Sequence, residues 1–542
     1  MKITRRHILK SGAALLAALG LPRFAGPAFA SASAAVPGEI LGAAAAAGHK
    51  LWQMGFAEPA EILQKDVVIV GGGIAGLGAA YRLHKAGVKD FALLELEKDP
   101  GGNAMSGRND VLAYPWGAHY VPVLTEESRA VIRLFEELKI ITGRDENGLP
   151  KYDEFFTCAD PHERLFMFDR WQETVLPQVG ADADDHAQYE RFFSYMESLK
   201  GKRGRDGKKL FAIPVDESSQ DAEWLELDRL SMKSWMDKGG YTSRYLQWHV
   251  NYSCRDDYGT TLEDVSAWAG IHYFAARDGK AANTGGENFV TWPEGNGFIV
   301  DRLVKPMKEN ISLQSLVYAV KKDENGVTVD YLDLKDNVTK RISAKTCILA
   351  CPQFVSSHLM PEDGAATGFT YAPWAVANVT LDKMPEGRGA DIAWDNVVFD
   401  SKLLGYVVAT HQKTEMQPLK TVLTYYWPLD HLPPDEARKE ALSRTYEQWR
   451  DIFLDELLVI HPELKGFVKR LDVWLWGHAM VRPVTGFMWS DERRRFLRQS
   501  PPVFRAHSDM SGLSIFEEAY THGVRAAEGV LSHLGVKHET EL

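Results

Sequence analysis

The sequence predicts an α/β fold: a Rossmann-like domain assembled from discontinuous segments, together with an α+β domain of mixed sheet and helices. Three observations predict it. A buried-type strand runs into a glycine-rich turn and a helix near residue 70, strand patterns return after residue 310, and long segments of mixed strand and helix character lie between and after them. The 542 residues, 45% of them hydrophobic, suffice for two or more domains.

The first 30 residues have the pattern of an export signal. Arg5 and Arg6 precede a short apolar stretch, Ser11 to Leu21, and the small-x-small site Ala28 to Ala30. This pattern predicts a signal peptide, and the paired arginines resemble a twin-arginine signal, so we expect a periplasmic protein. An uncleaved basic arm is the alternative. Residues 31–65, rich in alanine, are expected to form a lead-in that packs on the first domain.

The next stretch predicts a dinucleotide-binding unit. An apolar strand, Val67 to Val70, runs into a G-x-G-x-x-G turn, and a helix follows to Ala86. A second strand, Phe91 to Leu94, ends in Glu95, nineteen residues after the last glycine, where a carboxylate can accept hydrogen bonds from ribose hydroxyls. We expect a tight turn at Gly71 and close approach of a pyrophosphate at Gly73. Ile74 and Ala75 should form the N-terminal turn of the helix, and Gly76 should allow close helix packing.

A second glycine pair, Gly101 and Gly102, follows the acid. The run from Asp66 through Glu95 to this pair resembles the FAD-binding segment of the flavin amine oxidases, the family of monoamine and polyamine oxidases, in which such a pair reaches the phosphates. The resemblance implies FAD rather than NAD as cofactor. It also implies further cofactor contacts: Gly117 and Ala118 beside the flavin, the backbone of Val317 at the adenine, and Asp509 at the ribityl chain.

The resemblance spans residues 66 to about 532 and implies a division of the chain. Residues 66–125, 291–352 and 480–542 would form the FAD-binding domain, and residues 126–290 and 353–479 the substrate domain. Within this order the patterns predict a helix capped by Thr125, an Asn325-Gly326 hairpin and a helix from Asp435 to Val459. Strands are expected at 316–320, 347–350, 376–381, 405–410 and 421–427.

Several positions depart from the family pattern. Asn103 stands where an arginine usually follows the glycine pair, and the strand 375–379 has no lysine where these oxidases usually place one beside the flavin. The two aromatic rings that sandwich an amine in monoamine oxidases are replaced by His478 or Ala479 and by Ser514 or Ile515. No cysteine lies near His478, so we expect non-covalent FAD. His119 and His478 are the candidate proton-handling residues, because histidine titrates near neutral pH, and each is equally compatible with a structural role.

Charge and cysteine content limit the partners. The net charge of −12 becomes about −17 without residues 1–30, which hold five basic residues and no acid; this disfavours nucleic acid and favours a cationic small molecule. Asp256 and Asp257 could bind an amine, or pair internally with Arg255.

The four cysteines form no metal or haem motif, and the apolar stretch in the signal is too short to span a bilayer. No second G-x-G-x-x-G of similar quality supports a separate NAD(P)H site.

These observations predict an FAD-dependent enzyme that oxidises a C–N bond of an amine or polyamine by hydride transfer to flavin N5. One alternative keeps the fold and changes the reaction to desaturation or oxidation of a larger apolar or cyclic substrate, as in the related carotenoid desaturases and protoporphyrinogen oxidases. Another is a flavin-bearing protein without turnover. The electron acceptor, whether oxygen, a quinone or a redox protein, stays open.

Overall fold

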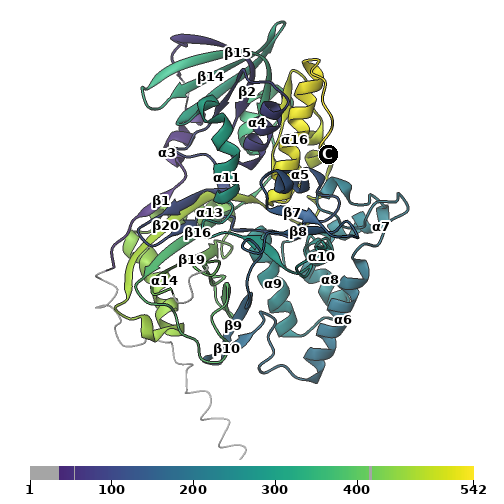
Figure 1. Cartoon of the computed structure of the whole chain (residues 1–542), viewed down its shortest axis with the longest axis vertical. Helices are drawn as coiled ribbons and strands as arrows, with labels where there is room; N and C mark the ends of the chain where they lie inside the picture. Colours follow the sequence, from purple (N-terminus) through teal and green to yellow (C-terminus); the bar gives the residue numbers. More distant parts are fainter. Residues whose placement is uncertain (1–35, 54, 414–417) are drawn as a thin grey trace, which may run out of the picture.

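The computed structural model describes residues 36–53, 55–413 and 418–542. The signal expected at residues 1–30 lies outside this part of the chain. One sheet occupies the upper part of the molecule in Figure 1, a second sheet crosses its middle, and a group of helices lies at the lower right.

The upper sheet is the predicted Rossmann-like unit. Its strands are β2 (Glu61–Val70), β3 (Phe91–Leu94), β12 (Ile311–Ser312), β13 (Ser315–Asp323), β14 (Gly326–Asp333), β15 (Val338–Leu349) and β21 (Val503–Arg505). The order is β12-β3-β2-β15-β14-β13, and β21 also pairs with β15. Parallel pairs join β12, β3, β2, β15 and β21, whereas β13, β14 and β15 pair antiparallel. The strands come from well-separated parts of the chain, so the predicted α/β fold with a discontinuous first domain is confirmed.

Two long helices pack together against this sheet: α4 (Ile74–Lys85) and, in yellow in Figure 1, α16 (Phe516–His533). A Cβ atom built on Gly523 of α16 would lie 2.2 Å from the carbonyl oxygen of Ala75 in α4, so only glycine allows this approach. Helices α5 (Arg129–Glu137) and α11 (Gly297–Val304) contribute to the same buried cluster. We therefore propose that the first domain extends past the boundary placed after residue 125, while the division of the chain otherwise stays a prediction.

The second sheet contains β1 (Ile40–Gly42), β9 (Glu163–Met167), β10 (Arg170–Glu173), β16 (Tyr371–Leu381), β17 (Asp395–Val398), β18 (Tyr406–Val408), β19 (Thr421–Pro428) and β20 (Val468–Val481). The order is β1-β20-β16-β19-β18-β17-β9-β10. Every residue of the central strand β16 is buried. Ala375, Ala377 and Val379 belong to a core with helix α14 (Tyr446–Ile460), whereas Trp374 and Val376 belong to a cluster with Trp116 of the first domain. Because successive side chains of a strand point to opposite faces of the sheet, one face of β16 points toward the first domain.

Helices at the lower right of Figure 1 enclose a third core around Trp268. They are α6 (Ala183–Leu199), α7 (Ala222–Leu225), α8 (Met232–Lys238), α9 (Arg244–Tyr258) and α10 (Ala267–Ala275). The remaining elements are α3 (Ala45–Gly48), β4 (Ser106–Arg108), β5 (Ala113–Pro115), β6 (Tyr120–Pro122), β7 (Ile141–Arg144), β8 (Pro150–Tyr152), β11 (Phe289–Thr291), α12 (Gln353–Leu359), α13 (Pro434–Ser443) and α15 (Asp491–Leu497).

Two local predictions were wrong, for reasons of hydrogen bonding. The single helix expected from Asp435 to Val459 is divided into α13 and α14, because Thr445 and Gln448 form a capping box that starts a new helix. Thr125 caps no helix: its hydroxyl donates to the carbonyl of Ile213, 3.0 Å away, and α5 begins four residues later. The Asn325-Gly326 hairpin and the expected strands are confirmed.

Candidate active site

A cavity of about 830 Å³ opens where the parallel strands of the upper sheet end. Its volume falls in the range of about 300–1,000 Å³ typical of ligand sites. Among the residues predicted from the sequence, those that line it are Gly71, Gly73, Ile74, Ala75, Glu95, Gly101, Gly102, Ala118, Val317, His478 and Asp509. The structure therefore brings together residues that are more than 400 positions apart in the sequence.

The glycine-rich turn has the geometry that the motif predicts. Gly71 has a φ of +105°, and a Cβ on Gly76 would lie 1.9 Å from the carbonyl oxygen of Gly71, so Gly76 serves helix packing and does not line the cavity. A Cβ on Gly73 would meet no atom nearer than 3.9 Å, so its surroundings are open. Helix α4 starts there without a side-chain cap or an acid in its first turn. Its free N–H groups suit a phosphate.

Glu95 is buried at the end of β3. Its Oε2 accepts a hydrogen bond from Gly72 N at 2.6 Å, and its Oε1 accepts one from Glu97 N at 2.8 Å. Burial raises the pKa of this carboxyl, and the neighbouring N–H groups offset part of the effect. A carboxylate has about four acceptor sites, so capacity remains for hydroxyl donors of a ligand.

Asp509 lines the larger cavity from the 3₁₀ turn Ser508–Met510. Its Oδ2 accepts hydrogen bonds from Gln353 N at 2.9 Å and from the hydroxyl of Tyr371 at 2.6 Å, and Nδ1 of His507 lies 3.0 Å from Oδ1. Burial alone would raise the pKa of Asp509, but the charge and hydrogen bond of His507 and the bonds from Tyr371 and Gln353 outweigh it and lower the pKa. Asp509 is thus a fixed acceptor beside the cavity.

A smaller cavity of about 140 Å³ adjoins the larger one. Both are lined by Asn103, Ala118, Asn296, Trp374, Trp476, Ala479, Ser514, Ile515 and Phe516. Gly117, His119 and Tyr426 line only the smaller one. The two cavities therefore adjoin, and a ligand in either one would contact residues that also line the other.

The aromatic wall of the smaller cavity was missed from the sequence. Three rings line the smaller cavity: Trp374 on β16, Tyr426 on β19 and Trp476 on β20. Ala479 and Ser514, predicted from the sequence to stand where the family has aromatic rings, line it as well. Asn296 was missed as well. Its Oδ1 is buried and lacks a hydrogen-bond partner in the described part of the chain, and such an atom suits a ligand donor. No described residue that lines either cavity is a lysine.

The two candidate histidines face different cavities. In the smaller one, His119 lies against Tyr426 with ring centroids 4.7 Å apart, and its Nδ1 lies 3.1 Å from the carbonyl oxygen of Gly117. Burial lowers the pKa of His119 to about 4, so the ring is neutral at pH 7. His478 lines the larger cavity beside Phe354, and burial together with the charge of Arg438 lowers its pKa to about 4. A role for His478 in proton transfer stays a proposal.

Acidic residues gather at the far side of the smaller cavity. Asp257 forms an ion pair of 2.6 Å with Arg277, and Arg255 pairs instead with Asp430, so the expected pairing with Arg255 is wrong. Asp256 lines the cavity and has no hydrogen bond or ion pair within the described ranges. Burial, followed by the charge of Asp257, raises its pKa to about 7. Burial also raises the pKa of Glu517 to about 7.

Cysteine placement bears on covalent attachment. All four cysteines are buried and unpaired, and Cys351 alone among them lines either cavity. It lies beside the glycine-rich turn, where the backbone N of Cys351 would be 3.5 Å from a Cβ on Gly71, and burial raises the pKa of its thiol to about 12. Cys254 does not line either cavity and packs in the core around Trp268.

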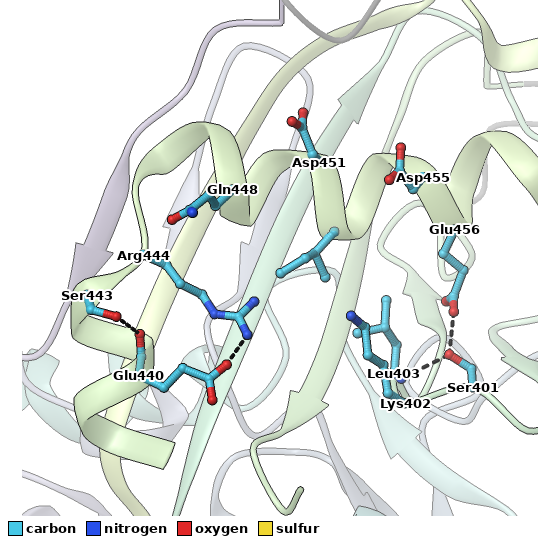
Figure 2. A pocket seen from close by; sticks show the side chains of 11 residues that line it. Ser401, Lys402, Leu403, Glu440, Ser443, Arg444, Gln448, Asp451, Asp455 and Glu456 are labelled. Carbon is cyan, nitrogen blue, oxygen red and sulfur yellow. Dashed lines mark hydrogen bonds and ion pairs between the residues drawn. The ribbon is translucent and has the colours of Figure 1, made fainter. Parts of the chain in front are cut away.

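A third hollow, of about 760 Å³, lies between α13, α14 and the loop at Ser401–Leu403. Figure 2 shows two of its side-chain contacts, Arg444 with Glu440 and Glu456 with Ser401. It shares no lining residue with the two cavities above and contains none of the residues predicted to act in the site. We assign it no part in the reaction.

The described residues contain no helix long and apolar enough to cross a membrane, and no group of three or more His, Cys, Asp or Glu residues in that same part of the chain could hold a metal ion.

Fold and cavity together define a dinucleotide-binding protein of the Rossmann type. A family model described as an NAD(P)-binding Rossmann-like domain matches residues 69–138. In sequence, the chain is 24% identical over 281 residues to amine oxidase [flavin-containing] A of Canis lupus familiaris. The matched region covers 49% of this chain and 47% of that protein. The chain thus spans about half the length of the curated relatives that it matches.

Solved structures extend the likeness to most of the chain. A variant of a putrescine oxidase superposes with a TM-score of 0.63 at 18% identity, covering 87% of this chain and 100% of that one. The cyclohexylamine oxidase of Brevibacterium oxydans gives a TM-score of 0.62 at 14% identity, covering 87% and 99%. At these identities the likeness shows a shared fold.

Proposed function

We propose that this protein is an FAD-dependent oxidoreductase that binds FAD non-covalently in the larger cavity and oxidises a C–N bond of an amine or polyamine in the smaller one. The observation that carries the proposal is that the two cavities share lining residues: the nucleotide-binding features line the larger cavity, and Asp256 and Tyr426 line only the smaller one. The likeness to proteins named as amine oxidases supports it.

The chain's own residues suit FAD. The open N-terminus of α4 would hold the pyrophosphate, the carboxylate of Glu95 would accept hydrogen bonds from the ribose, and Asp509 would accept them from the ribityl chain. The usual arginine is replaced by Asn103, whose amide donates instead to the carbonyl of Ala479 at 2.5 Å. A flavin bound there supplies a ring that accepts a hydride from a carbon next to nitrogen.

The smaller cavity suits an amine. A substrate nitrogen must be neutral when its carbon loses hydride. The Nδ1–H of His119 is directed at Gly117, which leaves Nε2 able to accept a hydrogen bond from an amine N–H, but a pKa of about 4 makes the ring too weak a base to hold the proton that an ammonium gives up. Asp256 can hold a second, distal ammonium, since it lines this cavity and makes no hydrogen bond or ion pair to another described residue. A di- or polyamine meets both requirements.

The smaller cavity favours an amine over the rival of a larger apolar or cyclic substrate by its volume of about 140 Å³ and by the carboxyl groups of Asp256, Asp257 and Glu517, although most of its lining is apolar. A protein that binds flavin without turnover is distinguished by experiment. Anaerobic mixing with amines should bleach the flavin if the proposal holds, and no candidate donor should bleach it if turnover is absent.

We also propose that the protein is exported to the periplasm by the twin-arginine route, on the evidence of Arg5 and Arg6, the apolar stretch Ser11 to Leu21 and the small-x-small site Ala28 to Ala30. That route carries folded proteins, which suits a chain that takes up its cofactor first. Oxygen, a quinone or a redox protein would accept the electrons, and nothing in the described residues favours one of these.

A further inference from the structure

The segment that precedes the glycine-rich motif forms part of the wall of the larger cavity. We call residues 38–52 the N-terminal strap. It contains β1, α3 and the 3₁₀ turn His49–Trp52, and its residues Ile40–Ala45, Gly48, His49, Leu51 and Trp52 line the cavity. Figure 1 shows α3 between the two sheets, with β1 on the edge of the lower one.

One end of the strap is bound to the second sheet. β1 pairs in parallel with β20 and places Ile40 opposite Val473 and Gly42 opposite Leu475. Glu39 adds a hydrogen bond from its N–H to Asp472 Oδ1 at 3.1 Å. The strap begins as a regular edge strand, held by backbone hydrogen bonds.

The other end is bound to the first domain. Ala44 N donates to Glu97 Oε1 at 2.8 Å, and Glu97 N donates in turn to Oε1 of Glu95 at 2.8 Å. Farther along, the ring of Trp52 lies nearly parallel to that of Phe354, 6.2 Å between centroids and 17° between planes. The strap is therefore connected through two hydrogen bonds to the carboxylate expected to hold the ribose.

We propose that the N-terminal strap is part of the cofactor site and retains non-covalently bound FAD by joining the two domains across one side of the cavity. This inference rests on the proposed function, because it presumes FAD in the cavity. A ligand can leave through this side only if the Ala44–Glu97 hydrogen bond breaks or β1 separates from β20. Loosening either contact should speed FAD release.

The pairing of β1 with β20 offers a reversible test. A Cβ built on Gly42 lies 3.8 Å from the Cβ of Leu475, the mean Cβ separation of about 3.8 Å found in disulfides. We expect the double variant Gly42→Cys/Leu475→Cys, purified with FAD, to release FAD at least about tenfold more slowly when oxidised than when reduced. The same protein reduced is the matched control, and the native cysteines are buried. Release is measured as the rise in FAD fluorescence after the loaded protein is diluted into buffer, where rebinding is negligible.

A second pair of variants tests the other end. Glu97→Ala removes the acceptor for Ala44 N and should speed release about tenfold, the loss expected for one hydrogen bond to a charged group. Glu97→Gln keeps an acceptor oxygen and should stay close to the native rate. Equal release rates in oxidised and reduced double variant, or a Gln variant as fast as the Ala variant, would overturn the role of the strap. If the native protein binds no FAD at all, the proposed function itself fails, and the two failures are thereby distinguished.

Discussion

Replacing Asp256 should weaken substrate binding while it stabilises the empty protein. Its carboxyl lines the smaller cavity without a protein partner, whereas its neighbour Asp257 is paired with Arg277. For Asp256→Asn, losing one charge-assisted contact of about 1.5–3 kcal/mol raises the KM for a diamine by about 10- to 150-fold. The kcat should change little, because a distal contact is made equally in the ground state and the transition state.

The stability effect follows from the pKa of Asp256, which is raised from 3.8 to about 7. Below about pH 4 the carboxyl is protonated in both the folded and unfolded protein and has no effect. Between there and pH 7 the unfolded chain loses the proton that the folded protein keeps, so stability falls as pH rises. Above pH 7 the penalty is complete, at most about 4 kcal/mol and less where water enters the cavity. Asp256→Asn removes it.

Asp257→Asn is the matched control, because it removes the ion-pair partner of the half-buried Arg277 and should cost about 1–3 kcal/mol of stability. Steady-state kinetics at several pH values and thermal melting of each variant make the comparison. The native KM should fall as pH rises through 7, and that dependence should vanish in Asp256→Asn. If Asp256→Asn melts at a lower temperature than the native protein at pH 8 and keeps its KM, the carboxylate is structural and the reasoning fails.

Four further predictions concern cofactor, protons, attachment and export. Glu95→Ala should weaken FAD binding by about tenfold or more, checked by titrating apoprotein, and unchanged retention would refute the ribose contact. Because the pKa of His119 is about 4, His119→Asn should slow flavin reduction without removing an ionisation between about pH 5.5 and 9 from the pH profile. Acid precipitation should release all the yellow colour, and colour left in the pellet would implicate Cys351. Changing Arg5 and Arg6 to Lys should hold the protein in the cytoplasm, and normal periplasmic yield would exclude the twin-arginine route.

The nucleotide side of the site could be predicted from the sequence because its requirements are local. Gly71 needs a positive φ, and Gly76 must lack a Cβ because the turn lies 1.9 Å from where that atom would be. Glu95 follows directly from the end of its strand. Each requirement involves neighbours within one strand, turn or helix, so residue type and spacing are enough to reveal it.

The substrate side could not be predicted in the same way. Trp374, Tyr426 and Trp476 meet because β16 pairs with β19 and β20 in a register that places Trp374 opposite Trp476 and Val376 opposite Tyr426. The partner of Asp257 is Arg277, beyond the end of α10, rather than the adjacent arginine, because the packing of α9 and α10 decides which guanidinium reaches the carboxylate. Strand register and helix packing are non-local, and the sequence pattern of each segment leaves them open.

The central claim is that an amine in the smaller cavity reduces FAD in the larger one. Anaerobic mixing of the FAD-loaded protein with mono-, di- and polyamines, followed by flavin absorbance, tests it most directly. We predict saturable bleaching that is strongest for a di- or polyamine and quickens as pH rises and the reacting nitrogen loses its proton. If no amine bleaches the flavin at any pH while dithionite does, the protein does not oxidise amines.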